Sequence, residues 1–305
     1  MSDRELHSLP FYNEAQVASV LEWHTLIDTI EMAMTSLSAG QVEQPVRQMV
    51  PVPGHDAIIA AMPAVGDAMA VKVVTLFHQN AGTGIPTHQA VIMVFDRDNG
   101  TPLCVMDGRL ITEMRTAAGS AAAARKLSRS DASILTIMGS GYQARAHAEA
   151  IRAVRPIEEI RLWSRTEANA RSAAEEIHAT YIADPEQAVR GADIVACTTS
   201  ATSPILNGGW LKKGAFVASV GWNGHDGREL DDAVMANTVV VESVSAARDQ
   251  AGNVRGSGCK IFAEVGEIFA GSKIAPDGAT IVYDSVGVAI QDVVAAQLAY
   301  DLLTA

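Results

Sequence analysis

The chain has 305 residues, a net charge of −12 at pH 7 and hydrophobic side chains at 48% of its positions. This length predicts two domains with well-filled cores, and the negative charge argues against general nucleic-acid binding. Apolar runs stay short of the roughly 20 residues that span a bilayer, and the polar, acidic start MSDRELHSLPFYNE is unlike a signal peptide. Cys104, Cys197 and Cys259 are scattered without metal-ligand spacing, so we expect a reduced, cytoplasmic protein without a metal site.

The first part of the chain has the pattern of an antiparallel α+β unit. Apolar positions at helical spacing run from Asn13 to Gly40, where glycine would end the helix. Short β-like pieces follow at residues 46–52, 57–62, 68–77 and 90–95. The dipeptide Asn99-Gly100 is a strong signal for a hairpin turn after the last of them.

From Thr112 onward the pattern is that of an α/β domain. Thr112 is a plausible N-cap for the small-residue helix TEMRTAAGSAAAARKL. Strand and helix patterns then alternate at 133–138, 142–153, 159–163, 167–177, 193–198, 215–220, 238–242 and 280–283, which predicts a parallel sheet wrapped by helices. The final helix, within VGVAIQDVVAAQLAYDLL, could pack back on the first part. We therefore predict a Rossmann domain, residues 114–287, inserted into an α+β domain, residues 1–113 plus 288–305.

A glycine-rich loop joins the first predicted strand and helix of this Rossmann domain. Its residues are Gly139, Ser140, Gly141, Tyr142, Gln143 and Ala144. Gly139 would permit a tight turn, Gly141 a close approach to a pyrophosphate, and Ala144 close packing of helix on sheet. The match alone is weak and a ligand-free turn is the alternative, but a preceding strand and a second strand at 159–163 favour dinucleotide binding.

The end of that second strand bears on the choice of dinucleotide. NAD-specific proteins usually carry an acidic residue there, whereas this chain has Ser164, Arg165 and Thr166. A cation with two hydroxyls suits a 2′-phosphate, which favours NADPH over NADH, although Glu167 follows directly.

Three basic residues outside this loop are candidates for binding an anionic substrate. Arg47 begins a strand, Lys72 interrupts the apolar run MAVKVV, and Arg115 would lie in the first turn of a helix, where a cation is unfavourable. A carboxylate substrate would give all three a role. Each also has a plain alternative, because the arginines could form surface salt bridges and Lys72 could point outward from an edge strand.

In combination and order, the motifs resemble those of the ornithine cyclodeaminase/mu-crystallin family over nearly the whole chain. The matching segments are PVR at 45–47, MPA at 62–64, KVV at 72–74, PTHQA at 86–90, MDGRLITEMRTAAGSAAAARKL, GSGYQARAH, RLWSRT, ELDD at 229–232 and SVGVAIQD at 285–292. The resemblance implies a homodimer in which the α+β domain binds substrate and forms the dimer.

The resemblance also implies site residues. Arg47, Lys72 and Arg115 match the positions that hold the substrate carboxylate, whereas His88 could reach the site or be a structural histidine. Cofactor contacts are further expected from Thr198 and from the segment Ser285, Val286 and Gly287. Asp284 departs from the family pattern, which has lysine there, and the sequence does not explain what compensates this change.

Asn223 helps to choose among the chemistries of the family. Ornithine cyclodeaminases resemble Gly-Ala-Asp-x-Pro-Gly here, and their aspartate handles substrate amino groups. Asparagine can hydrogen-bond an imine but cannot act as a base, and Asp226 reads more simply as a turn residue. We therefore expect an NAD(P)H-dependent reductase of cyclic ketimine carboxylates, with Lys72 and Asn223 as catalytic residues. Ornithine cyclodeaminase, alanine dehydrogenase and a non-catalytic small-ligand-binding protein remain alternatives.

Overall fold

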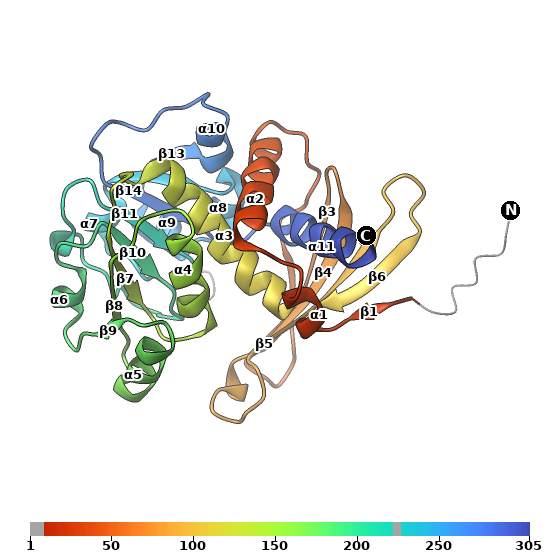
Figure 1. The fold of residues 1–305 in the computed structure, drawn as a ribbon, viewed down its shortest axis with the longest axis horizontal. Helices are drawn as coiled ribbons and strands as arrows, with labels where there is room; N and C mark the ends of the chain where they lie inside the picture. The colour runs from red at the N-terminus through yellow and green to blue at the C-terminus, as the bar shows by residue number, and fades with distance from the viewer. Residues whose placement is uncertain (1–8, 222–226) are drawn as a thin grey trace, which may run out of the picture.

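The computed structural model describes residues 9–221 and 227–305 (Figure 1). Its first sheet has six strands in the order β1-β6-β5-β4-β3-β2, antiparallel except for the β1–β6 pair. The strands are β1 Phe11–Tyr12, β2 Gln48–Pro51, β3 Ala57–Val65, β4 Met69–Phe77, β5 His88–Phe95 and β6 Pro102–Asp107. The antiparallel pattern was predicted, and Gly100, with a φ of 76°, lies in the predicted hairpin.

The helices of this part begin elsewhere than predicted. The expected helix from Asn13 to Gly40 is two helices, α1 Glu14–Ala18 and α2 Trp23–Ser38. The break follows Ser19, whose hydroxyl donates to the carbonyl of Gln16 at 2.7 Å and competes with continued helix. Helix α3 spans Arg109–Leu127 and starts before Thr112, because the Asp107 side chain accepts from the amide of Arg109 at 2.8 Å. Arg115 is therefore in the second turn, so the argument from an unfavourable first turn was wrong.

The second sheet has eight strands, all parallel, in the order β13-β12-β14-β11-β10-β7-β8-β9. The strands are β7 Ile134–Met138, β8 Glu159–Trp163, β9 Thr180–Tyr181, β10 Ile194–Cys197, β11 Phe216–Ser219, β12 Thr238–Val241, β13 Ile261–Glu264 and β14 Ile281–Asp284. Alternate residues of β10 fall into separate apolar clusters, Ile194 and Ala196 in one, Val195 and Cys197 in the other. Both faces of the sheet are thus covered, as the predicted Rossmann fold requires.

The helices of this second part are α4 Tyr142–Arg152, α5 Glu167–Glu176, α6 Pro185–Val189, α7 Asp232–Met235, α8 Val244–Gln250, α9 Gly252–Ser257 and α10 Val265–Phe269. Short 3₁₀ turns occupy His78–Asn80 in the first part and Gly208–Trp210 in the second. Helices α6 to α10, like β9 and β13, were not predicted, because elements this short carry little periodicity. Among the described residues, no helix is both long and apolar enough to cross a membrane.

Two helices connect the sheets. The C-terminal helix α11, Ala289–Thr304, packs on β3, β4, β5 and α2, so the predicted return to the first part is confirmed. Figure 1 shows α3 running diagonally between the two sheets, and it contacts β5, β11 and β14. The faces of the six-stranded sheet differ: α11 covers the inner face, whereas Val50, Ile59 and Val91 of the outer face are 59%, 40% and 44% exposed.

Candidate functional site

The three predicted basic residues come together on the inner face of the six-stranded sheet. Lys72 lies on the central strand β4 between Met62 and Ile92 and is only 2% exposed, so it does not point outward from an edge. Lys72, Arg47 and Arg115 line one cavity of about 200 Å³. The structure thus groups side chains that are far apart in the sequence.

Asp292 on α11 holds two of these cations. Its carboxylate lies 2.7 Å from Lys72 Nζ and accepts from Arg115 Nε at 2.9 Å. Arg115 Nη1 also donates to Gln291 Oε1 at 2.8 Å. Arg47 is held differently, because its Nη2 donates to the carbonyls of Val286 and Gly287 at 2.6 and 2.9 Å. Gly287 has a φ of 76°, and a Cβ there would stand 2.6 Å from Arg115.

Burial and crowding of like charges shift the pKa values in this cluster. Burial lowers the pKa of Lys72 to about 7, and repulsion by Arg115 and Arg47 acts in the same direction. The attraction of Asp292 opposes this shift but does not cancel it. Burial and Arg115 likewise lower the pKa of Arg47 to about 10. The pKa of Asp292 is lowered despite its burial, because Arg115 and Lys72 stabilise its anion. Since one carboxylate bridges only two of three cations, the cavity favours an anionic ligand.

One wall of this cavity is apolar. Ile58, Ala60, Met62, Val74 and Leu76, all from β3 and β4, contribute its wall. The described lining residues include no aspartate or glutamate. The cavity therefore combines a cationic anchor with an uncharged compartment.

A larger cleft of about 540 Å³ adjoins this cavity. Gly141, Tyr142 and Gln143 of the glycine-rich loop line it, and so do Thr198 and Thr199 after β10. The two hollows share His88, Thr112, Gln143 and Val220. His88 thus lies at their junction, and burial, with Lys72 and Arg115, lowers its pKa to about 4, which keeps its ring neutral near pH 7.

The glycine-rich loop has the form that a dinucleotide requires. A Cβ on Gly139, whose φ is 134°, would lie 2.5 Å from Thr198 Oγ1, so the turn needs glycine. Gly141 precedes α4 and has open space where a side chain would stand, and Ala144 is fully buried. These features fit a pyrophosphate at the start of α4.

The residues predicted to select NADPH lie beyond the end of β8. Ser164 Oγ is 3.0 Å from Ser140 Oγ in the loop, and Thr166 precedes α5 as its N-cap. Arg165 between them is exposed. Ser285, Val286 and Gly287, also expected at the cofactor, line the smaller cavity beside Arg47. Asn223 and Asp226 lie outside the described residues.

Buried acids that sequence reasoning missed support this site. Glu242, 1% exposed, accepts from the amides of Val286 and Gly287 at 3.0 and 2.7 Å and thereby holds the carbonyls that bind Arg47. Asp284, which replaces the expected lysine, accepts from Asn253 Nδ2 at 2.8 Å, and burial raises its pKa to about 7. The asparagine and a partly neutral carboxyl account for the tolerance of an acid there. Asp292 itself had a signal, as an acidic residue in an apolar helix.

Comparison with known proteins agrees with this geometry. The model of the ornithine cyclodeaminase/mu-crystallin family matches residues 10–305. The ketimine reductase mu-crystallin of Mus musculus is 41% identical over 285 residues, covering 90% of this chain and 91% of that protein. The Δ1-pyrroline-2-carboxylate reductase of Bacillus cereus strain ATCC 14579 is 34% identical over 303 residues, covering 93% of each.

Solved structures with similar folds include two whose ligands are known. One is the Thermococcus litoralis Δ1-pyrroline-2-carboxylate reductase in complex with NADH and L-proline, with a TM-score of 0.91, 32% identity and coverage of 96% of this chain and 97% of that one. The other is an archaeal alanine dehydrogenase dimer with bound NAD, with a TM-score of 0.90, 26% identity and coverage of 96% and 95%.

The bridge made by Asp292 leads to a stability prediction. We expect Asp292→Asn to lower the free energy of unfolding by about 3 kcal/mol or more, because Lys72 and Arg115 lose their shared counter-charge in a buried site. Urea unfolding measures this loss. Asp301→Asn, on the exposed side of the same helix, is the matched control and should change little. Equal midpoints for the two variants would contradict the role given to Asp292.

Proposed function

Because the chain belongs to the ornithine cyclodeaminase/mu-crystallin family, we propose that it is an NAD(P)H-dependent reductase of cyclic ketimine carboxylates. The reaction would convert Δ1-pyrroline-2-carboxylate or Δ1-piperideine-2-carboxylate to proline or pipecolate. A hydride adds to the imine carbon, the C=N bond becomes a single bond, and the nitrogen retains a proton. The single observation that carries the proposal is the cavity that joins three cations to an apolar wall beside a dinucleotide cleft.

In this mechanism the substrate carboxylate is bound by Arg47 and Arg115. Asp292 fixes Arg115, and the carbonyls of Val286 and Gly287 fix Arg47, so little side-chain freedom is lost on binding. Lys72, with a pKa near neutrality, supplies a proton to the imine nitrogen and a positive charge to the carboxylate. The nicotinamide, when bound, supplies the hydride. Asn223 is proposed to orient the nitrogen.

The division of the chain follows these tasks. Residues 1–113 and 288–305 are proposed to bind the substrate, and residues 114–287 the dinucleotide. The proposed boundary falls within α3, and Arg115 on that helix joins the substrate site. The three free cysteines fit the proposed cytoplasmic location.

The cavity argues against ornithine as the substrate. Cyclodeamination requires proton transfers at two amino groups, and a carboxylate is the usual partner for a second ammonium. Among the described residues, the lining of the cavity includes no carboxylate that could bind a second ammonium. A cyclic ketimine needs no second ammonium site.

The function can be tested by direct assay. We expect NADPH oxidation with Δ1-pyrroline-2-carboxylate or its six-membered homologue, no release of ammonia from ornithine with NAD, and no ammonia-dependent reduction of pyruvate. Absorbance of the reduced nicotinamide at about 340 nm reports turnover. A cofactor complex that turns over none of the imino acids would instead favour a ligand-binding protein.

The pKa of Lys72 predicts a pH dependence. As a proton donor Lys72 is active when protonated, so kcat/KM should fall as the pH rises through about 7. Lys72→Arg, always protonated, should lower kcat at least tenfold and remove this limb. Rate profiles between about pH 5.5 and pH 9 measure both effects. A limb unchanged in Lys72→Arg would belong to the substrate imine and would contradict the assignment.

Arg165 is proposed to favour NADPH. Arg165→Ala should raise the KM for NADPH about tenfold, because a charge-assisted hydrogen bond to the 2′-phosphate is lost, and should leave the KM for NADH nearly unchanged. The control is Arg171→Ala, an exposed arginine on α5. Parallel changes for both cofactors would refute the selection.

The outer face of the six-stranded sheet is proposed as a homodimer interface. Ala61, Val73 and Val91 are adjacent across three strands of this face, which presents few polar side chains. Val91→Glu should yield monomers in analytical ultracentrifugation, whereas Ile274→Glu, at a site 84% exposed elsewhere, should leave the assembly intact. An unaltered sedimentation coefficient in Val91→Glu would exclude this face.

A further inference from the structure

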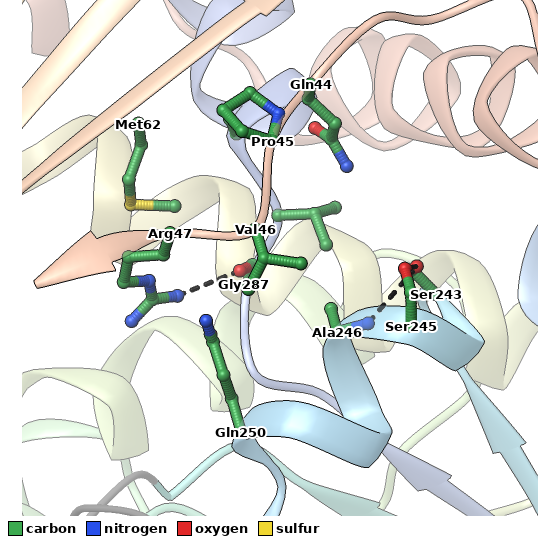
Figure 2. Close-up of a pocket in the computed structure, with 12 residues that line it drawn as sticks. Gln44, Pro45, Val46, Arg47, Met62, Ser243, Ser245, Ala246, Gln250 and Gly287 are labelled. Carbon is green, nitrogen blue, oxygen red and sulfur yellow. Dashed lines mark hydrogen bonds between the residues drawn. The ribbon is translucent and has the colours of Figure 1, made fainter.

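A second, much smaller cavity lies beside Arg47 (Figure 2). Its volume of about 30 Å³ exceeds the roughly 10–15 Å³ that one buried water requires and is far below the 200 Å³ of the proposed substrate cavity. It shares Arg47, Met62 and Gly287 with the proposed substrate cavity. Ser243, Ser245 and Gln250 contribute polar groups to it. Arg47 therefore separates a substrate-sized space from a water-sized one.

Gln250 is the unusual residue of this small cavity. It is 2% exposed, and its Nε2 has no hydrogen-bond partner among the described residues. A buried amide donor without an acceptor is destabilising, because its hydrogen bond to water is lost and not replaced. Figure 2 shows the Gln250 side chain extending from α8 toward the guanidinium of Arg47 and Gly287. Since an amide nitrogen is a donor, Gln250 Nε2 requires an acceptor in this cavity.

We propose that a water molecule bound in this cavity accepts hydrogen bonds from Gln250 Nε2 and from the Arg47 guanidinium. The carbonyl of Gly287, which lines the same cavity next to Arg47 and the tip of Gln250, offers an acceptor for a proton of this water. The cavity thus meets both requirements of a buried water site, sufficient volume and several polar partners. Gln250 is then a positioning residue, which acts on the substrate only through Arg47.

The consequence for binding rests on the proposed function, in which Arg47 binds the substrate carboxylate. The carbonyls of Val286 and Gly287 hold one end of the guanidinium from the α11 side. The water and Gln250 hold it from the α8 side, so that its plane is fixed before substrate arrives. Loss of the bridge should weaken carboxylate binding and spare hydride transfer.

The test compares two substitutions in the full-length protein. Gln250→Leu removes the polar group at similar volume, whereas Gln250→Glu keeps an acceptor for the guanidinium. Gln250→Leu should raise the KM for Δ1-pyrroline-2-carboxylate about tenfold with kcat within about twofold, and Gln250→Glu should stay within about threefold of the wild type. Gln297→Leu, at a half-buried glutamine of α11 that donates to Asp301, is the matched control.

A binding measurement separates this inference from the proposed function. Calorimetry of pyrrole-2-carboxylate, a flat carboxylate that cannot be reduced by hydride, should show the same tenfold loss in Gln250→Leu with NADPH present. Unchanged affinity in a folded Gln250→Leu overturns the role of Gln250 and leaves the reductase intact. Equal losses in both variants, or a parallel loss of NADPH affinity, overturn it in favour of packing. If the wild type neither binds this analogue nor reduces a ketimine, the proposed function itself fails.

Discussion

The ion bridge centred on Asp292 is the interaction on which the candidate site depends. One carboxylate from the last helix reaches Lys72 on a central strand and Arg115 on α3. Buried cations are costly in isolation, and each would drive the other apart without this anion. The bridge neutralises only part of the charge, so the cluster remains receptive to a second carboxylate. Asp292 therefore stabilises the fold and still leaves positive charge in the cavity for an anionic ligand.

Two further buried acids, Glu242 and Glu229, also hold several groups at once, but they lie outside the lining of the cavity. Glu242 accepts five hydrogen bonds, from Tyr283, Ser285, Val286, Gly287 and Gln291. Glu229 accepts from the amides of Thr199 and Gly221 and so ties together the ends of β10 and β11 at the cofactor cleft. Carboxylates are well suited to this work because each oxygen accepts more than one bond. These hydrogen bonds hold the segments that line the two hollows.

Much of this organisation could be predicted from the sequence, and the exceptions have physical causes. The parallel sheet follows from periodicity, and the glycine-rich loop from its place between a predicted strand and helix. The grouping of Arg47, Lys72 and Arg115 was expected from the family resemblance. Asp292 stood out as an acid in an apolar helix, but neither its partners nor the role of Glu242 could be assigned, because these contacts span 220 and 45 residues of chain that no local pattern encodes. The start of α3 was misjudged for a related reason, since Asp107 outcompetes Thr112 only once the strand before it is in place.

The continuity of α3 constrains how the protein can move. Thr112, which borders both hollows, and Arg115, which anchors the substrate cavity, sit on successive turns of one buried helix that contacts strands of both sheets. Free hinge motion between the two proposed domains would require flexible connecting segments. One of the connections is instead the continuous helix α3, which rises about 1.5 Å per residue. The spacing between the proposed substrate cavity and the dinucleotide cleft is then set by the geometry of one helix.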